Sequence, residues 1–466
     1  MRKPNQTPLV AQTSGASFRD PAGFIFKDAS GVLLRQINKA GKADFDQLHA
    51  SGLYNELIQR GMMVAHRQVD ISKACTADAA AVIQPDLVPY ISYPFEWSFS
   101  QLKDAAILTL EIQKRALKHG MTLKDASAYN VQFVAGKPVF IDTLSFEAYK
   151  PGKPWQAYRQ CCQHFLAPLA LMAHTDVSLL QLLRVHLDGI PLDLASKLLP
   201  RRAKVRPGIA MHIALHGRAQ KAKESEHVAP VRQVSESGMV GILESLLRTV
   251  RSQKVPVTTT EWDDYYDKTN YTAEAADKKA ALLTQLVKPL KVATAVDIGG
   301  NNGRYSRVLN DLGITTVCTD IDPNAVEANY QYVRHNNETR MLPLLVDITN
   351  PGGALGWANQ ERATVAERLR CDVVVALAII HHLAISNNLP FAYIAQYFSQ
   401  LSDHLVLEFV PKSDSQVKKL LATRDDIFPQ YNEQGLEEAF GAIYQLTKKQ
   451  KIPGTERTLY LFTRKP

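Results

Sequence analysis

At 466 residues the chain is too long for one ordinary core, so we expect two or three domains. A composition of 45% hydrophobic and 21% charged residues is that of a globular protein, and no apolar run approaches the roughly 18–20 residues of a membrane span. The basic residues behind the net charge of +8 are scattered along the chain, apart from the two basic stretches Arg201–Arg206 and Lys448–Lys451, so nucleic acid is not the expected partner.

Cysteine usage and the first residues predict the compartment. The five cysteines are odd in number and match neither a disulfide framework nor a C-x-x-C metal site, as in a reducing environment. The opening residues, M-R-K-P-N-Q-T-P, contain no apolar signal segment. We therefore expect a cytoplasmic protein with no bound metal and no membrane partner.

The first half of the chain predicts an α+β domain over residues 18–190, preceded by a polar, mobile tail at residues 1–17. Alternating runs and apolar residues at helical spacing indicate its elements. In chain order we expect a hairpin over Gly23–Ile37, a helix over Phe45–His66, a β-like run at Ala81–Pro94, a helix over Ser100–His119, two short strands within Leu123–Thr143, and helices over Ala157–Met172 and Val177–Leu187.

A basic, weakly helical connector is expected over residues 191–256, and an α/β domain over residues 257–466. Strands alternate with helical patterns in this domain, which predicts a mostly parallel, doubly wound sheet with the last strand added antiparallel. The expected strands lie near 293–298, 314–319, 342–346, 371–377, 404–410 and 457–463, with helices at Glu274–Val287 and Glu433–Phe440 among those between and around them.

The strand that ends at Ile298 runs into a glycine-rich turn, G-G-N-N-G, and then into a helix. A dinucleotide fingerprint started at Gly299 needs glycines at 301 and 304, where the chain has Asn301 and Arg304, and no G-K-[ST] follows for a phosphate loop. The looser pattern D-x-G-x-[GN]-x-G fits, because asparagine is the residue besides glycine that best tolerates positive φ. This turn predicts a nucleotide-like cofactor at the carboxyl end of the first strand.

Polar side chains also follow the next three strands. Asp320 ends T-T-V-C-T-D, where it could accept both hydroxyls of a ribose, and Asp347 ends L-P-L-L-V-D, near the expected adenine amino group. Each has a plainer alternative: Asp320 or Asp322 could cap the next helix, and Asp347 could be a turn residue. The fourth strand runs into I-I-H-H-L, which places His381 and His382 at the same edge of the sheet.

Taken in this order, the turn, the two strand-end aspartates and H-H-L resemble the class I S-adenosylmethionine-dependent methyltransferases. The resemblance covers about residues 258–466 and implies a Rossmann-like, mostly parallel sheet of seven strands with S-adenosyl-L-methionine as the cofactor. Asn301 stands where many members have glycine, at the methionine end of the site. The resemblance implies cofactor-binding roles for Asp297, Gly299, Asn301, Gly303, Asp320 and Asp347.

A sulfonium methyl donor is already activated, so such an enzyme chiefly aligns the acceptor with the methyl group and excludes water. If the acceptor is a hydroxyl or an amine, His381 or His382 could act as general base, and the sequence does not choose between them. Glu408, near the end of V-L-E-F-V, and Arg457, before the last strand, are further candidates on the acceptor side.

An aromatic segment, T-E-W-D-D-Y-Y-D-K-T-N-Y, precedes the first strand of the sheet. Its rings could cover the cofactor and favour the cationic sulfonium, with Trp262 and Tyr266 as cofactor contacts beside Tyr265 and Tyr271. The alternative is an ordinary amphipathic helix that packs on the sheet.

A second resemblance lies in the N-terminal half. Asp125 and Asn130 have the spacing D-x-x-x-x-N, and Asp142 ends the strand P-V-F-I-D. They resemble the catalytic loop and the metal-binding aspartate of protein-kinase-like and aminoglycoside-phosphotransferase-like folds. The chain departs from that pattern, because Leu123 stands in place of the histidine of H-x-D, no glycine follows Asp142, and a glycine-rich loop is missing.

The two-part layout resembles bacterial nodulation-associated, methyltransferase-like proteins, through T-E-W-D-D-Y-Y, D-I-G-G-N-N-G-R-Y-S and I-I-H-H-L. The leading hypothesis is a methyltransferase that uses S-adenosylmethionine on a small-molecule or carbohydrate-like acceptor. The alternatives are a kinase-like or pseudo-kinase protein with a methyltransferase-like domain, and a scaffold that binds cofactor without turnover. The sequence determines neither the acceptor nor the oligomeric state.

Overall fold

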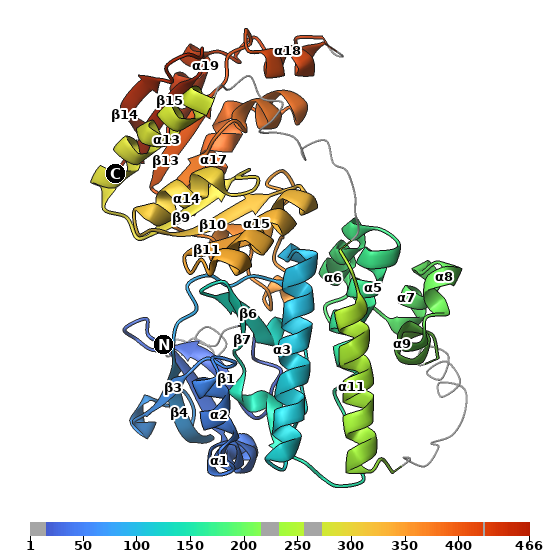
Figure 1. Ribbon diagram of the computed structural model, residues 1–466. Helices are drawn as coiled ribbons and strands as arrows, with labels where there is room; N and C mark the ends of the chain where they lie inside the picture. The colour runs from blue at the N-terminus through green and yellow to red at the C-terminus, as the bar shows by residue number, and fades with distance from the viewer. Residues whose placement is uncertain (1–14, 216–232, 256–272, 423–424) are drawn as a thin grey trace, which may run out of the picture.

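The computed structural model describes residues 15–215, 233–255, 273–422 and 425–466. An N-terminal half, blue to light green in Figure 1, lies against a C-terminal half, yellow to red. Residues 1–14 of the expected tail lie outside the described ranges. Within those ranges, no helix combines the length and the hydropathy that a membrane crossing requires.

Seven strands of the C-terminal half form one sheet in the order β11-β10-β9-β12-β13-β15-β14. Neighbouring strands from β11 to β13 are parallel, and β15 runs antiparallel to both of its neighbours, which confirms the predicted arrangement. The sequence pattern does not predict β14, because most side chains of this edge strand are polar and exposed. The strands are β9 (Thr294–Ile298), β10 (Thr315–Asp320), β11 (Met341–Leu345), β12 (Val373–Ala376), β13 (His404–Phe409), β14 (Tyr444–Lys451) and β15 (Thr458–Arg464).

Helices cover both faces of this sheet (Figure 1). Val373 and Val375 of β12 pack with α13 and α14 on one face, and Val374 and Ala376 pack with α17 on the other. A strand covered on both faces is apolar throughout, which explains the run V-V-V-A. The helices of this half are α13 (Ala273–Val287), α14 (Arg304–Asp311), α15 (Pro323–Asn336), α16 (Val365–Arg368), α17 (Phe391–Leu401), α18 (Ser415–Leu421) and α19 (Glu433–Gly441).

The N-terminal half opens with an antiparallel sheet in the order β1-β2-β4-β3, and its first two strands confirm the predicted hairpin. The single helix expected over Phe45–His66 is wrong: Gly52, with φ of 81°, separates two helices, and His66 begins a strand. The elements are β1 (Gly23–Lys27), β2 (Leu33–Asn38), α1 (Lys42–Ala50), α2 (Leu53–Gln59), β3 (His66–Val69), β4 (Ala79–Pro85), η4 (Pro94–Glu96), β5 (Met121–Leu123), β6 (Val131–Val134), β7 (Lys137–Phe140) and β8 (Phe146–Ala148).

Two long helices, α3 (Phe99–Lys118) and α11 (Glu236–Ser252), lie side by side in this half (Figure 1). The apolar face of α11, which includes Leu243, Leu246 and Val250, is buried, so a packed helix lies within the segment expected to be a connector. Shorter helical segments come between them along the chain: α4 (Tyr158–Cys161), η7 (Cys162–Leu166), α5 (Ala167–His174), η8 (Val177–Gln181), α6 (Leu182–Val185), α7 (Leu192–Leu198), α8 (Arg201–Lys204), α9 (Pro207–Ile209) and η9 (Ala210–Leu215).

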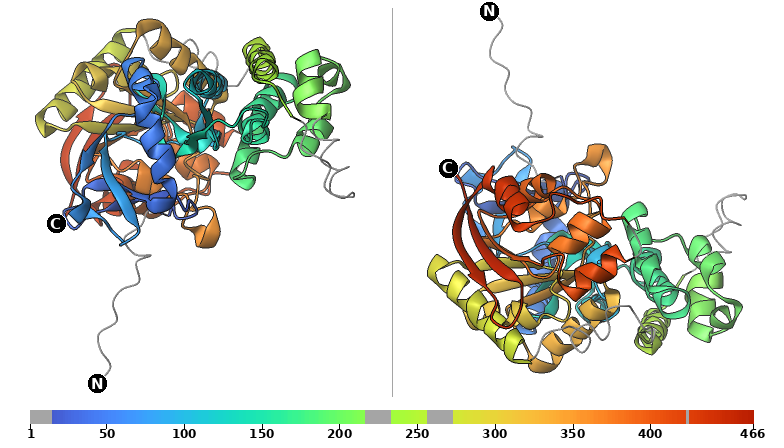
Figure 2. Two further views of the ribbon diagram at one scale, coloured as in Figure 1. Left: turned by 90° about the horizontal axis from the view of Figure 1, so that it is seen from below. Right: turned by 90° about the horizontal axis from the view of Figure 1, so that it is seen from above.

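Polar and aromatic contacts join the two halves where α3 meets α15 (Figures 1 and 2). The hydroxyl of Tyr330 donates to Asp104 Oδ2 at 2.8 Å, and Arg334 Nε lies 3.2 Å from the same oxygen. The ring of Tyr330 also meets that of Phe133 edge-on, with centroids 5.8 Å apart. One hydrophobic cluster contains buried residues of both halves, so the two halves share a core.

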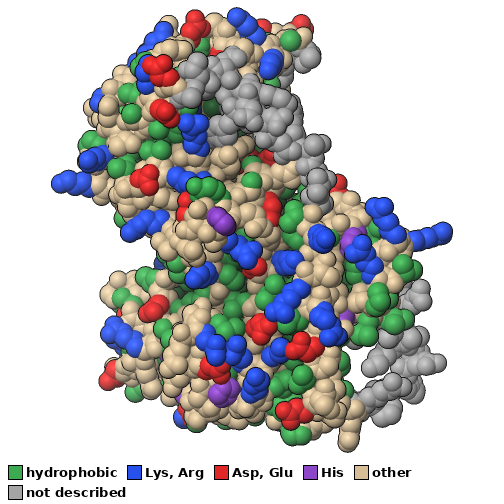
Figure 3. Space-filling model, in the orientation of Figure 1, with side chains coloured by type: hydrophobic (Ala, Val, Ile, Leu, Met, Phe, Trp, Pro, Cys, Tyr) green, Lys and Arg blue, Asp and Glu red, His purple; other side chains and the backbone are tan. Residues whose placement is uncertain are grey.

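Surface charge is spread over the face of the molecule that Figure 3 shows. In Figure 3, Lys and Arg side chains are interspersed with Asp and Glu across the visible face. Of the two basic stretches, Arg201–Arg206 begins with the short helix α8, and Lys448–Lys451 belongs to the edge strand β14. The basic side chains behind the net charge of +8 therefore form no single basic patch on the face shown.

Candidate active site

The glycine-rich turn joins β9 to α14 at the carboxyl edge of the sheet. Gly299 and Gly303 have φ of 70° and 83°, and Asn301 has φ of 49°, the left-handed conformation that the sequence predicts for this asparagine. The N–H of Gly299 donates to the carbonyl of Thr319 at 2.8 Å, which ties the turn to β10. The positive φ favours glycine at residue 299, and a Cβ there would also lie 2.8 Å from Ile379 Cδ1, so that side chain would have to move.

The carboxylate of Asp320 lies against this turn. Its Oδ2 accepts a hydrogen bond from Asn301 N–H at 2.8 Å, and its Oδ1 accepts one from Asp322 N–H at 2.9 Å. Burial raises the pKa of Asp320 to about 6, although the backbone donors oppose this shift. The neighbouring Asp322 is the cap of α15, because its own Oδ1 accepts from Asn324 N–H at 2.9 Å. The two aspartates of D-I-D-P therefore have different surroundings and different partners.

Asp347 follows β11 by two residues, at the strand next to β10. Its Oδ1 accepts hydrogen bonds from the N–H and the hydroxyl of Thr349 at 2.8 and 2.7 Å, so it stabilises a turn, as the plainer alternative proposes. It also lines a pocket of about 250 Å³ together with Ile321, the residue after Asp320. The ends of β10 and β11 thus open on the same cavity.

Asp297 lies beneath the turn and is 1% exposed. The hydroxyl of Ser306 donates to its Oδ2 at 2.6 Å, and burial raises its pKa to about 6. A Cβ at Gly300 would lie 2.8 Å from the same oxygen, so the carboxylate is packed directly under the turn. These contacts give Asp297 a supporting role, and its direct contact with a cofactor stays a prediction.

His381 and His382 come after β12, where the π-helical turn η12 (His382–Ser386) begins. Their ring centroids are 4.2 Å apart. Burial lowers the pKa of His382 to about 4 and that of His381 well below its usual value, and the charge of Arg457 acts in the same direction on both. His381 is 1% exposed, whereas His382 is only partly buried. Both imidazoles are therefore neutral at pH 7, and His382 is the more accessible of the two.

A buried ion-pair network lies at the end of β13. Glu408 is fully buried and contacts Lys279 Nζ at 2.5 Å and Arg457 Nη1 at 3.3 Å. Arg457 also binds Asp414 through Nε at 2.8 Å. The sequence singles out Glu408 and Arg457 but neither Lys279 nor Asp414. No local signal identifies Lys279, because it comes from α13, 129 residues before Glu408.

The N-terminal candidates Asp125, Asn130 and Asp142 lie close together, and other side chains of the protein bind Asn130 and Asp142. Arg35 of β2 forms a buried ion pair with Asp142, and the hydroxyl of Ser145 donates to the other carboxylate oxygen at 2.5 Å. Asn130 Nδ2 in turn donates to Ser145 Oγ at 3.0 Å. Within the part of the chain that the structure describes, no group of three His, Cys, Asp or Glu residues could hold a metal ion. The kinase-like fold of this half is not confirmed.

The aromatic segment of the predicted lid lies outside the described residues, so its role stays a prediction. This applies to Trp262, Tyr265, Tyr266 and Tyr271. The other predicted residues gather at the carboxyl edge of one sheet, because each lies at the carboxyl end of a parallel strand or in the turn after it. They are Asp297, Gly299, Asn301, Gly303, Asp320, Asp347, His381 and His382.

The strand order, the left-handed glycine turn after β9, and the carboxylates that follow β10 and β11 define the fold of the C-terminal half as that of a class I S-adenosylmethionine-dependent methyltransferase. No model of a known protein family matches the chain. It is 34% identical over 466 residues to the nodulation protein NoeA of Rhizobium meliloti (strain 1021), covering 98% of this chain and 97% of that protein. The chain therefore belongs to the family of NoeA.

Many solved structures are similar to parts of the chain. The N-methyltransferase NodS from Bradyrhizobium japonicum WM9 is 12% identical with a TM-score of 0.32, covering 42% of this chain and 98% of that one. The bifunctional kinase-methyltransferase WbdD is 14% identical with a TM-score of 0.29, covering 44% of this chain and 40% of that one.

Proposed function

We propose that this protein is an S-adenosylmethionine-dependent methyltransferase that acts on a small-molecule or carbohydrate-like acceptor. The observation that carries the proposal is the 2.8 Å contact between Asn301 N–H and the Asp320 carboxylate, beside a turn in which Gly299 and Gly303 have positive φ. This contact holds an accepting carboxylate at the edge of a doubly wound sheet where a nucleoside binds.

The residues around the turn fit such a cofactor. The raised pKa of Asp320 means that its backbone donors do not compensate for its burial, and two ribose hydroxyls would provide further hydrogen bonds. Glycine at position 299 would let the amino-acid end of the cofactor approach the backbone. Bound S-adenosylmethionine would supply an activated methyl group on a positively charged sulfur.

On the acceptor side, His382 would contact the group that receives the methyl. A neutral imidazole accepts a hydrogen bond from a hydroxyl or an amine, which orients its lone pair toward the methyl group. A pKa of about 4 makes His382 a weak base, so we assign it chiefly to orientation. We assign His381 to packing beneath its neighbour, because it is almost completely buried.

Phosphoryl transfer by the N-terminal half is not favoured. In kinases an aspartate at the position of Asp142 holds Mg²⁺. Here Arg35 neutralises Asp142 and Ser145 binds its second oxygen. We therefore place the reaction in the C-terminal half alone.

Isothermal titration calorimetry of the full chain with S-adenosylhomocysteine tests the cofactor site. We expect the wild type to bind and Asp320→Ala to lose detectable binding, because no carboxylate is left to accept from the ribose. Asp311→Ala changes an exposed carboxylate at the far end of α14 and should bind as the wild type does. A wild type that binds no ligand, or an Asp320→Ala variant with unchanged affinity, would overturn the proposal.

A further inference from the structure

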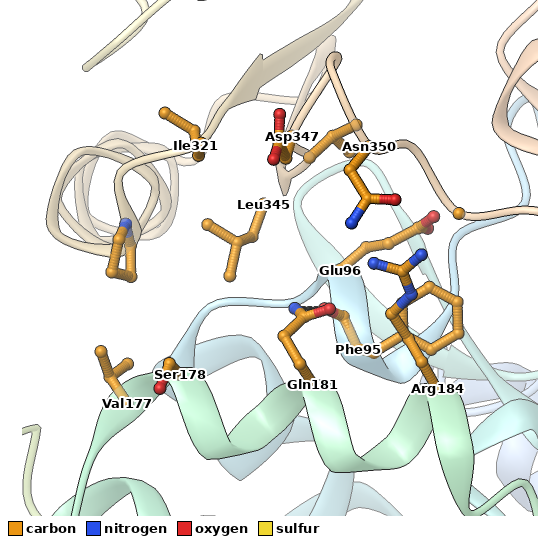
Figure 4. A pocket seen from close by; sticks show the side chains of 13 residues that line it. Phe95, Glu96, Val177, Ser178, Gln181, Arg184, Ile321, Leu345, Asp347 and Asn350 are labelled. Atoms are coloured by element: carbon orange, nitrogen blue, oxygen red, sulfur yellow. Dashed lines mark hydrogen bonds between the residues drawn. The ribbon is translucent and has the colours of Figure 1, made fainter.

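A pocket of about 250 Å³ lies where the two halves meet, beside the ends of β10 and β11. The C-terminal half contributes Ile321, Asp347 and Asn350 to its lining, and the N-terminal half contributes η8, α6 and η4. Figure 4 shows Gln181 and Arg184 extending from the helical segment η8–α6 toward the loop that carries Asp347 and Asn350. The enclosure of this space therefore depends on both halves.

The lining combines apolar side chains with polar and charged ones, among them Glu96, Arg184 and Asn350. Ile321 and Leu345 on one side face Val177 on the other, and Asp347 and Gln181 add a carboxylate and an amide. The amide of Gln181 is fixed, because its Nε2 donates to the carbonyl of η4 residue 95 at 2.9 Å. Apolar side chains on opposite walls, with polar groups beside them, suit a flat heterocycle that has a hydrogen-bonding edge.

Buried contacts hold the N-terminal wall in place. Glu96 and Arg368 form an ion pair in which neither side chain is more than 4% exposed, and the Arg368 guanidinium lies 3.9 Å from the ring centroid of Tyr93. The hydroxyl of Tyr93 accepts a hydrogen bond from Ala363 N–H at 2.8 Å. Moving the wall away from the pocket would break a buried ion pair between the halves, which is costly. The wall is therefore preformed.

From this placement we infer that the N-terminal half forms one wall of the cofactor site and holds the base of S-adenosylmethionine against Ile321. The inference rests on the proposed function, because Asp320 then fixes the ribose one residue away. The base lies between Ile321 and the segment Val177–Gln181, and its polar edge faces Asp347 and Gln181. The methyltransferase half thus depends on the N-terminal half to bind its cofactor.

Calorimetry on full-length variants with two ligands tests this inference. S-Adenosylhomocysteine and 5′-methylthioadenosine share the base and differ at the amino-acid end. Ser178 lines the pocket at an exposed position, so Ser178→Trp should fill the space and weaken both ligands by the same factor, about tenfold or more. The matched control is Val185→Trp, which adds the same aromatic bulk at a 75% exposed position outside the pocket. This control should bind both ligands as the wild type does.

Thermal melting shows whether each variant is folded. If Ser178→Trp does not fold, Gln181→Leu removes the amide at nearly constant size and should weaken both ligands about threefold. Wild-type affinity in Ser178→Trp, or in Gln181→Leu where Ser178→Trp does not fold, together with no binding by Asp320→Ala, would overturn this inference. The proposed function would then stay intact. A loss for S-adenosylhomocysteine alone would place the pocket at the amino-acid end and also overturn it. No binding of either ligand to the wild type would overturn both.

Discussion

Two carboxylates at the same edge of the sheet, the fully buried Glu408 and the partly buried Asp320, are compensated in opposite ways. Glu408 contacts two cations, Lys279 and Arg457, at 2.5 and 3.3 Å. Asp320 accepts hydrogen bonds from backbone N–H groups, and its pKa rises to about 6. The end of β13 is thus stabilised by the protein itself, whereas the end of β10 would gain from the hydrogen-bond donors of a ligand. At the proposed ligand site the carboxylate is bound by backbone N–H groups instead of cations.

The largest effect is expected from Glu408→Gln. The change removes the carboxylate partner of Lys279 and leaves a buried ammonium group against a neutral amide. We expect the free energy of unfolding to fall by about 3 kcal/mol, measured by denaturant titration. The matched control is Glu274→Gln, which breaks an exposed pair with Lys278 and should leave the free energy of unfolding unchanged. A Glu408→Gln variant as stable as the wild type would show that the network contributes no stability.

The affinity for S-adenosylhomocysteine should fall as the pH is lowered through 6. The folded pKa of Asp320 is raised from 3.8 to about 6, so below this pH the carboxyl group carries a proton that must leave before it can accept from both ribose hydroxyls. The association constant should approach a loss of about tenfold per pH unit below the pKa, measured by calorimetry between pH 5 and pH 7. The residual affinity of Asp320→Asn should be flat over that range. Burial also raises the pKa of Asp297 to about 6, so a control must show which aspartate causes the loss of affinity. In Asp297→Asn the affinity for S-adenosylhomocysteine should still fall as the pH is lowered through 6.

The smallest effect is expected from Asp322→Ala. This change removes the side-chain cap of α15 and should lower the free energy of unfolding by about 1 kcal/mol. The affinity for S-adenosylhomocysteine should not change, because Asp320 keeps its hydrogen bond from the backbone of residue 322. A clear loss of affinity, with stability unchanged, would mean that Asp322 contacts the ligand instead of the helix.

The cofactor side of the site could be predicted from sequence because it depends on local rules. A strand, a glycine-rich turn and a helix occupy consecutive residues, and Asn301 in the turn adopts the predicted left-handed φ. Asp320 and Asp347 follow strands whose carboxyl ends must meet at one edge once the sheet is parallel. The same local rules predict the mostly parallel sheet and its antiparallel last strand.

The rest of the site and of the fold depends on contacts that no short sequence pattern predicts. Lys279 lies in a helix whose sequence, D-K-K-A-A, is typical of an exposed surface, and it is buried because α13 places it against Glu408. Val177 and Gln181 come from another half of the chain and reach the site through packing of the two halves. The edge strand β14 is polar along most of its length, so its hydropathy does not distinguish it from a loop.

A crystal structure of the full chain with S-adenosylhomocysteine is the most direct test of where the nucleoside binds. We expect the ribose hydroxyls within hydrogen-bonding distance of Asp320, and the base in the pocket between Ile321 and Val177. Well-defined ligand bound elsewhere, with the Asp320 carboxylate unchanged beside the turn, would contradict the account.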